Sequence, residues 1–266
     1  MKVSEGRIVE VVMHTINNRS VIARGFTSDV YAWNDGQVLK LLHTGRSHAD
    51  AEREYKVSQA IHAAGLPVPE VFDLVEVEGR TGIIFERLEG ISFFRQVQAR
   101  PWTLFRGTRQ IAELHAAIHA LPAPSGLPSQ RERIRAKIES ANSLSAGDRE
   151  TALRCLEDLP DGDALCHGDF HPENIIATAR GPMIIDWGSA TRGHPLGDVA
   201  WTSSLIHNAP VPPGIPTFMR LLTEYSRLVL ARTYLNRYLQ LNPGSRQLID
   251  TLQTLHALTA RWPTGH

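Results

Sequence analysis

Hydrophobic and polar residues alternate in short stretches through the first ninety residues, which predicts strands. The segments RSVIARG, DVYAW and QVLKLL are rich in β-branched and aromatic residues. The last two flank an Asp35-Gly36 pair, which favours a tight hairpin turn because such turns need positive φ. VFDLVEV and TGIIFERL predict a second hairpin around Glu78-Gly79. Between the hairpins, AEREYKVSQAIHAAG predicts a helix that ends at Gly65.

After Gly90 the apolar spacing becomes that of helices. LFRGTRQIAELHAAIHAL places Leu104, Ile111, Leu114 and Ile118 on one face, and RERIRAKIESA and DRETALRCLEDL predict two further helices. The last sixty residues are mostly helical by spacing. We therefore predict an α+β fold, with a β-rich lobe over residues 1–88 and a larger α-helical lobe over residues 89–266.

Composition narrows the function classes only a little. The 266 residues contain 28 Lys plus Arg and 28 Asp plus Glu, so no excess charge favours nucleic acid or a membrane surface as partner. No stretch resembles a signal peptide or a membrane span. Two cysteines are too few for a disulfide framework or a zinc cage. We expect a cytoplasmic protein that binds neither nucleic acid nor membranes.

The stretch CHGDFHPENIIATARGPMIIDWG carries the candidate chemistry. Asp169 is followed after four residues by Asn174, and a predicted hairpin then presents Asp186 beside this loop. Phosphoryl transfer needs such a set: one carboxylate takes the proton of the acceptor hydroxyl, while an amide oxygen and a second carboxylate hold Mg²⁺ against the triphosphate. We predict Asp169 as the catalytic base and Asn174 and Asp186 as the metal ligands.

Two other interpretations of this stretch were weighed. His167, Asp169 and His171 alternate, and on a strand they would share a face and could bind zinc. Pro172 is unsuited to a central strand, however, and no further ligand cluster lies at zinc spacing. Alternatively, the polar residues would only cap turns. The order of all three residues around a hairpin favours phosphoryl transfer over both alternatives.

A phosphoryl-transfer site requires phosphate-binding groups upstream. Lys40 in VLKLL lies on the third predicted strand, and Glu54 on the following helix could fix its ammonium group. The turn RGFTSDVY offers Gly25 and Ser28 for the phosphate oxygens, although it contains a single glycine. These residues are the predicted nucleotide-binding set.

These motifs together resemble the aminoglycoside phosphotransferase family of small-molecule kinases. The resemblance rests on CHGDFHPENII, IIDWGSA, LKLL, EYKVSQAIHAAGLPVPEV and ELHAAIHAL, and it spans roughly residues 18–205. It implies a protein-kinase-like two-lobed fold with ATP, or alternatively GTP, between the lobes. It also implies a hinge at FERL, where the Glu86 carbonyl and the Leu88 amide meet the adenine edge.

The acceptor is predicted to be a small molecule. His171 stands where protein kinases carry lysine, and Asp198 follows Asp186 by only twelve residues, which is too short for a peptide-docking segment. Asp198 is expected to brace the loop by accepting backbone amides. Six arginines and two acids follow Trp201, which favours a neutral or anionic acceptor over a polycationic sugar. A nucleotide-binding pseudokinase and, less favoured, a protein kinase are the alternatives. His115 and His119 have metal-like spacing, but we interpret them as packing and polar surface residues.

Overall fold

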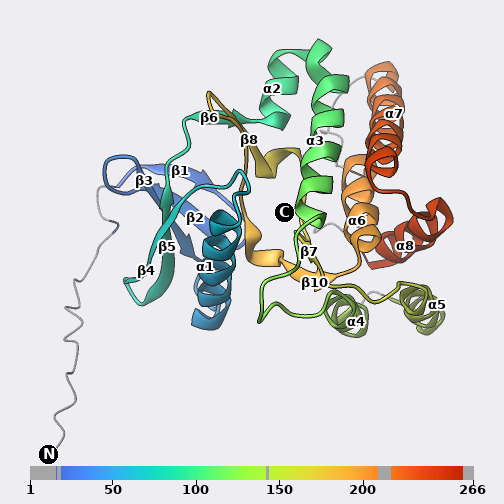
Figure 1. Ribbon diagram of the computed structural model, residues 1–266, viewed down its shortest axis with the longest axis horizontal. Helices are drawn as coiled ribbons and strands as arrows, with labels where there is room; N and C mark the ends of the chain where they lie inside the picture. Colours follow the sequence, from blue (N-terminus) through green and yellow to red (C-terminus); the bar gives the residue numbers. More distant parts are fainter. Residues whose placement is uncertain (1–15, 17–18, 142–143, 209–216, 260–266) are drawn as a thin grey trace, which may run out of the picture. The chain divides into compact units, whose positions relative to one another are not determined.

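The computed structural model describes residues 16, 19–141, 144–208 and 217–259 (Figure 1). Their contacts divide into two compact units. The first contains the described residues up to Tyr55 together with Glu70–Arg87, and the second contains Lys56–Pro69 and the described residues from Leu88 onward. The second half of the first helix, which the predicted lobe boundary kept with the strands, thus groups with the helical unit.

The first unit is a five-stranded antiparallel sheet with the spatial order β1-β2-β3-β5-β4. All the strands predicted in this region are present. They are β1 (Val21–Arg24), β2 (Ser28–Ala32), β3 (Gln37–Leu42), β4 (Val71–Val77) and β5 (Arg80–Glu86). The predicted hairpin turns form through positive φ angles, 67° at Gly36, 51° at Glu78 and 72° at Gly79.

Alternation along β3 divides its side chains between two cores. Leu39 and Leu41 pack on one face of the sheet, whereas Leu42 packs on the other face with Ala51 of α1 (His48–Ala63). Lys40 has the parity of Leu42, so its side chain leaves the sheet on the face that α1 covers. The helix begins with a side-chain cap, in which the Asp50 N–H donates to Ser47 Oγ at 3.1 Å.

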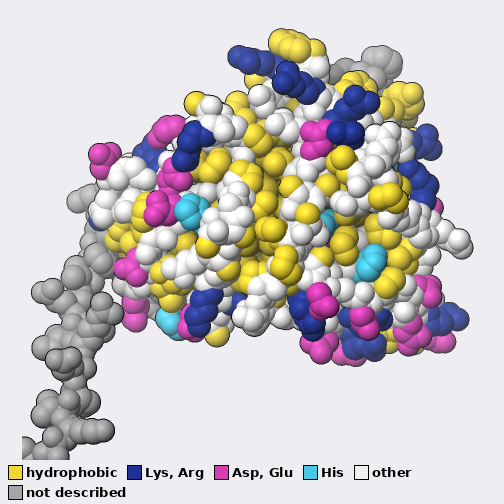
Figure 2. All heavy atoms as spheres, viewed as in Figure 1, with side chains coloured by type: hydrophobic (Ala, Val, Ile, Leu, Met, Phe, Trp, Pro, Cys, Tyr) yellow, Lys and Arg dark blue, Asp and Glu magenta, His cyan; other side chains and the backbone are white. Residues whose placement is uncertain are grey.

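The second unit is mainly helical and contains five short strands (Figure 1). Its helices are α2 (Phe93–Ala99), α3 (Leu104–His119), α4 (Gln130–Ser140), α5 (Ala146–Glu157), α6 (Pro195–Asn208), α7 (Thr217–Leu241) and α8 (Arg246–Thr259). Its strands are β6 (Gly90–Ser92), β7 (Ala164–Cys166), β8 (Ile175–Thr178), β9 (Gly181–Ile184) and β10 (Thr191–Gly193). The hairpin predicted around Arg180-Gly181 is β8–β9, and β6 extends it to three strands. Along the edge carrying α4 and α5, basic and acidic side chains are interspersed, as expected of solvated helical faces (Figure 2).

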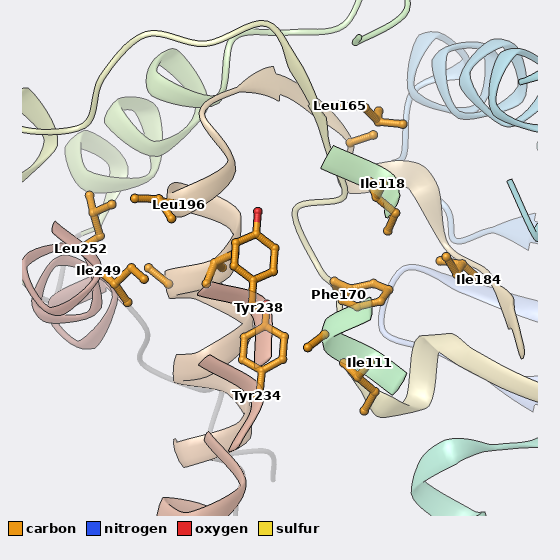
Figure 3. Packing of buried hydrophobic residues seen from close by; sticks show 14 of the residues in the cluster. Ile111, Ile118, Leu165, Phe170, Ile184, Leu196, Tyr234, Tyr238, Ile249 and Leu252 are labelled. Carbon is orange, nitrogen blue, oxygen red and sulfur yellow. The ribbon is translucent and has the colours of Figure 1, made fainter. Parts of the chain in front are cut away.

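One large hydrophobic core supports the second unit. Figure 3 shows buried side chains of this core from α3, α6, α7, α8, β7 and β9, together with Phe170, which belongs to the loop after β7. Those labelled are Ile111, Ile118, Leu165, Ile184, Leu196, Tyr234, Tyr238, Ile249 and Leu252. Full burial of each such side chain contributes about 1.5–3 kcal/mol, so this core holds the loop before β8 in place. None of the described helices is both long and apolar enough to span a lipid bilayer.

Candidate active site

The loop between β7 and β8 presents Asp169 at the surface of the second unit. β7 leads into Gly168, whose φ is +77° and whose Cα lies so close to the Ser189 carbonyl that an added Cβ would stand 2.2 Å from that oxygen. Glycine is required here by both conditions. The sharp turn leaves the Asp169 side chain 39% exposed, while Phe170 next to it is fully buried. The loop therefore has a buried anchor and an accessible carboxylate.

Asn174 is held by this same loop. Its side-chain Nδ2 donates to the Asp169 carbonyl oxygen at 2.9 Å and lies 3.2 Å from His171 Nε2. Asn174 is buried, and its main-chain carbonyl oxygen accepts a hydrogen bond from the Ile185 N–H at 3.0 Å. The amide nitrogen is thus fixed toward the loop, and the amide oxygen is the atom presented in the opposite direction.

Asp186 lies at the same end of the β8–β9 hairpin as Asn174. The register pairs Ile175 with Ile184, so the residues just before β8 and just after β9 are neighbours. Asp186 has φ +65° and ψ +66°, a left-handed conformation that is uncommon outside glycine, although aspartate adopts it more readily than most residues, and that turns the chain sharply. Such backbone strain is frequent where a side chain must be aimed.

His167 connects the catalytic loop to the hairpin. Its Nε2 lies 3.1 Å from the Ile185 carbonyl oxygen, its Nδ1 accepts from the Asp169 N–H at 3.2 Å, and its ring is 4.5 Å from that of Trp187. Burial lowers the pKa of His167, against the opposing charges of Asp198, Asp169 and Asp186. A neutral imidazole thus lies among three carboxylates. Asp169 and Asp186 are both close enough to His167 for their charges to act on its pKa.

The donor set at this end of the hairpin fits a hard divalent cation. Asn174 offers an amide oxygen and Asp186 a carboxylate, both oxygen donors of the kind that Mg²⁺ prefers. Because the Asn174 side-chain nitrogen donates a hydrogen bond to the Asp169 carbonyl, the side-chain oxygen of Asn174 is the atom available as a ligand. Soft ligands are absent from the loop: the nearby Cys166 is buried, and burial followed by the charge of Asp198 raises the pKa of its thiol. The set does not match a zinc site.

The predicted lysine–glutamate pair lies within the first unit. Lys40 Nζ and Glu54 Oε1 are 2.6 Å apart, with exposed side-chain fractions of 12% and 5%. Glu54, rather than Glu52, is thus the partner on α1. A buried ammonium group needs such a charged partner, and the pair presents a fixed positive charge on the covered face of β3.

The remaining nucleotide-binding candidates are backbone features. Gly25 and Ser28 close the β1–β2 turn, where the Gly25 N–H donates to the Ser28 carbonyl at 2.9 Å and a Cβ on Gly25 would stand 2.9 Å from that oxygen. Glu86 ends β5, and Leu88 follows in an extended segment outside the sheet. Their contacts with a nucleotide stay a prediction.

Two cationic residues of α4 near the loop were not predicted. Arg133 donates to Ser189 Oγ at 3.3 Å, and Lys137 Nζ lies 5.1 Å from the centre of the Trp201 ring. Lys137 is exposed as a whole residue, yet desolvation of its ammonium group, followed by the charge of Arg133, lowers its pKa, while Asp169 opposes the shift. Their spacing of four residues on a charged helix gave no sign in the sequence that they turn toward the catalytic loop.

Asp198 accepts backbone amides as predicted, whereas the prediction for two histidines was wrong in part. The N–H groups of His167 and Gly168 donate to Asp198 at 2.6 and 3.0 Å. His115 and His119 are packing residues but not surface residues, since both are buried against Asp198. Helical spacing places them on one face but does not show what covers that face.

A comparison with protein families decides the assignment. The sequence model of the phosphotransferase enzyme family matches residues 19–229. The chain belongs to the phosphotransferase enzyme family. The resemblance read from its motifs is thereby confirmed, and the chain is a small-molecule phosphotransferase of the kinase type.

Solved structures of the family confirm the two-lobed fold. An aminoglycoside-3'-phosphotransferase of type VIII has a TM-score of 0.62 at 18% identity, covering 90% of this chain and 93% of that one. Amicoumacin kinase, in complex with AMP-PNP, Ca²⁺ and Ami, has a TM-score of 0.63 at 14% identity, with 94% and 81% covered. An aminoglycoside phosphotransferase from Streptomyces rimosus, bound to ADP and streptomycin, has a TM-score of 0.60 at 18% identity, with 91% and 92% covered. At these identities the likeness shows the fold alone.

Curated relatives are much longer proteins. Acyl-CoA dehydrogenase family member 11 of Gallus gallus is 28% identical over 213 residues, which is 66% of this chain and 27% of the relative. The protein of that name from Homo sapiens is 26% identical over 211 residues, again 66% and 27%. The alignment thus spans about a quarter of the length of these relatives.

Proposed function

We propose that this phosphotransferase moves the γ-phosphate of ATP to a hydroxyl group of a small molecule in a Mg²⁺-dependent reaction. The observation that carries the proposal is the position of three residues in the second unit: Asp169 is exposed on the catalytic loop, while Asn174 and Asp186 leave neighbouring ends of the β8–β9 hairpin. GTP stays an alternative phosphate donor. An ATP-dependent reaction also supports a cytoplasmic location.

In the proposed mechanism Asp169 orients the acceptor hydroxyl and accepts its proton as the oxygen attacks phosphorus. General-base assistance of this kind is worth about 10²–10⁴-fold. Asn174 and Asp186 would hold the magnesium ion, which when bound neutralises charge on the phosphate oxygens. Lys40, fixed by Glu54 at 2.6 Å, would hold phosphate oxygens in the first unit, where Gly25 and Ser28 shape the β1–β2 turn. Glu86 and Leu88 would bind the adenine edge.

We also propose that the acceptor is neutral or anionic. The C-terminal arginines, from which the sequence predicted such an acceptor, support this less than expected. Arg220 pairs with Glu224 at 3.1 Å, and Arg237 pairs with Glu113 at 2.6 Å. Arg133 and Lys137 of α4 support it better, since they place two cations near Asp169 and Ser189. A polycationic acceptor would be repelled from that surface.

The decisive experiment compares the Asp169→Asn variant with the unmodified enzyme. We expect the variant to fold and to bind Mg²⁺–ATP with unchanged affinity, while phosphate transfer falls about 10²–10⁴-fold. Asp250→Asn, at an exposed aspartate of α8, is the matched control and should transfer at the normal rate. Full turnover by Asp169→Asn would contradict the assigned base, and ATP binding without any transfer by the unmodified enzyme would favour the pseudokinase alternative.

The acceptor is identified by a panel of hydroxylated small molecules that differ in charge. It contains aminoglycosides, amino alcohols, neutral sugars and hydroxylated carboxylic acids. Hydroxyacyl-CoA thioesters are included because the curated relatives carry an acyl-CoA dehydrogenase name. We expect neutral or anionic members to be phosphorylated. Rapid phosphorylation of an aminoglycoside would overturn the proposed acceptor charge without affecting the proposed chemistry. Incorporation of labelled phosphate into protein would instead favour a protein kinase.

A further inference from the structure

Two histidines and two tyrosines surround Asp198 beneath the catalytic loop. His115 and His119 come from α3, Tyr234 and Tyr238 from α7, and Asp198 from the first turn of α6. All five are at least nine-tenths buried. Figure 3 shows the two tyrosines directed into the core beside Phe170, the residue after Asp169.

Every polar side-chain atom of the two histidines has a partner. His115 Nδ1 lies 2.6 Å from the Tyr234 hydroxyl, and its Nε2 lies 3.1 Å from Asp198 Oδ2. His119 repeats the arrangement one turn later, with Nδ1 2.7 Å from the Tyr238 hydroxyl and Nε2 3.3 Å from the same Asp198 oxygen. Two parallel chains of hydrogen bonds therefore run from α7 through α3 to one carboxylate.

The partners fix which nitrogen of each ring carries the proton. An ionised carboxylate only accepts hydrogen bonds, so the nitrogen facing Asp198 must be Nε2–H in both histidines. In a neutral ring the other nitrogen, Nδ1, is then an acceptor, and the tyrosine hydroxyl must donate to it. Each phenol thus selects the tautomer that its histidine needs in order to donate to Asp198.

Electrostatics agrees with this arrangement. Burial, followed by the neighbouring His119, lowers the pKa of His115 to about 3, so this ring is neutral at neutral pH. Burial disfavours the charge of Asp198, but hydrogen bonds from His115 and His119 hold its pKa well below the usual range. A buried carboxylate stays charged because donors surround it, and here the donors are side chains on α3 and backbone amides of the loop.

The Asp198 carboxylate also binds the backbone of the catalytic loop through two hydrogen bonds. Asp198 Oδ2 accepts the N–H of His167 at 2.6 Å, and Oδ1 accepts the N–H of Gly168 at 3.0 Å. Gly168 directly precedes Asp169. The path from the tyrosine hydroxyls to the backbone that carries the proposed base is therefore continuous and contains no solvent-exposed member.

We propose that Tyr234 and Tyr238 are positioning residues for phosphate transfer, which act through His115, His119 and Asp198 on the loop backbone at His167 and Gly168. The link to catalysis rests on the proposed role of Asp169. Without a tyrosine hydroxyl, Nδ1 loses its donor and the Nδ1–H tautomer becomes accessible. That tautomer turns a lone pair toward Asp198, which then holds the loop amides with fewer donors around it.

The proposed tautomers are measured directly by ¹⁵N NMR of histidine-labelled protein, with His115→Gln and His119→Gln for assignment. We expect both rings to carry a proton on Nε2 that faces Asp198, with Nδ1 accepting from the tyrosine hydroxyl. Zinc or another metal bound by the two Nε2 atoms and Asp198 Oδ2, which lie within 4.8 Å of one another, requires the opposite tautomer with Nδ1–H donating to tyrosine. A stoichiometric metal in the purified protein, or Nδ1–H rings, would overturn the proposal.

The positioning role is tested with Tyr234→Phe, Tyr238→Phe and the double variant. Tyr225→Phe is the matched control, because this tyrosine lies on the same helix and is 66% exposed. We expect the double variant to remain folded by thermal unfolding. Amide exchange at His167 and Gly168 should rise by at least about tenfold, because these bonds then open locally. Turnover of Mg²⁺–ATP, with water as acceptor if no panel member is phosphorylated, should fall in kcat by about tenfold or more at a nearly unchanged KM for ATP.

The outcomes separate this proposal from the proposed function. Unchanged amide exchange at His167 and Gly168 in the double variant refutes the positioning role whatever the activity. A loss of kcat together with a matching rise in KM for ATP refutes it too, since general loosening of the fold would explain that result. Absence of any turnover by the unmodified protein would overturn the proposed function, while tautomers and amide exchange would still decide whether the tyrosines hold the loop.

Discussion

Buried neutral histidines make the second unit less stable as the pH falls into the mildly acidic range. Burial lowers the pKa of His115 to about 3 and that of His256 to about 4, from an ordinary histidine pKa of 6.5. The unfolded chain therefore binds protons at these positions before the folded chain does. Stability from these residues is fully present above the unfolded pKa and is lost as pH falls below about 6.5.

The magnitude follows from the two pKa values. Below the unfolded pKa each such histidine lowers the free energy of unfolding by about 1.4 kcal/mol per pH unit. Between about pH 7.5 and about pH 5.5 this amounts to about 1.4 kcal/mol for each histidine, or roughly 3 kcal/mol for the two. The loss continues at lower pH until the folded-state values are reached.

Urea unfolding followed by tryptophan fluorescence at several pH values measures this dependence. The perturbation is His256→Gln, which removes one of the two titrating groups while leaving the Asp198 network intact. We expect the loss between about pH 7.5 and about pH 5.5 to shrink by about 1.4 kcal/mol in this variant. His62→Gln, at an exposed histidine of α1, should leave the loss unchanged. A pH dependence that is the same in His256→Gln and in the unmodified protein would refute the reasoning.

Three further predictions concern the residues around the candidate site. Gly168→Ala should lower the free energy of unfolding by about 2 kcal/mol or more, because φ is +77° and a Cβ would stand 2.2 Å from the Ser189 carbonyl. Gly147→Ala in α5, where a Cβ meets nothing within 4 Å, should be neutral or slightly stabilising in the same urea experiment. Glu54→Gln should cost about 3–5 kcal/mol by removing the carboxylate that pairs with the buried ammonium group of Lys40 and should weaken ATP binding by calorimetry, whereas exposed Glu76→Gln should do neither. Asp186→Asn should keep the fold, since asparagine tolerates the left-handed backbone, and should lower transfer more than Asp169→Asn does; transfer by the variant at the normal rate and with an unchanged Mg²⁺ requirement would contradict its role as a ligand.

Local sequence patterns were sufficient to predict the strand, the helix and the hairpin that carry the candidate site residues. Alternation predicted β3, which carries Lys40, and the helical pattern that follows predicted the helix that carries its partner Glu54. The hairpin that places Asn174 next to Asp186 followed from two short apolar runs and a turn. Each of these relations spans few residues, so backbone geometry alone fixes them.

Relations between distant segments were beyond such patterns. The tyrosines that bond His115 and His119 lie 119 residues further along the chain, so spacing within α3 showed two histidines on one face and nothing about their environment. Arg133 likewise looks like an ordinary member of a charged helix, and only packing of α4 against β10 brings it to Ser189. Burial and long-range partner choice are decided by tertiary packing.

The β8–β9 hairpin offers a place from which the site could be observed without disturbing it. Its turn at Ala179-Arg180 is exposed and lies at the opposite end from Asn174 and Asp186, about 13 Å away along a four-residue strand. A fluorophore or spin label attached at Ala179 would be fixed to the same pair of strands that positions the two oxygen donors, Asn174 and Asp186. Such a probe would report cation and nucleotide binding from outside the reacting centre, and a longer turn inserted there should leave catalysis untouched.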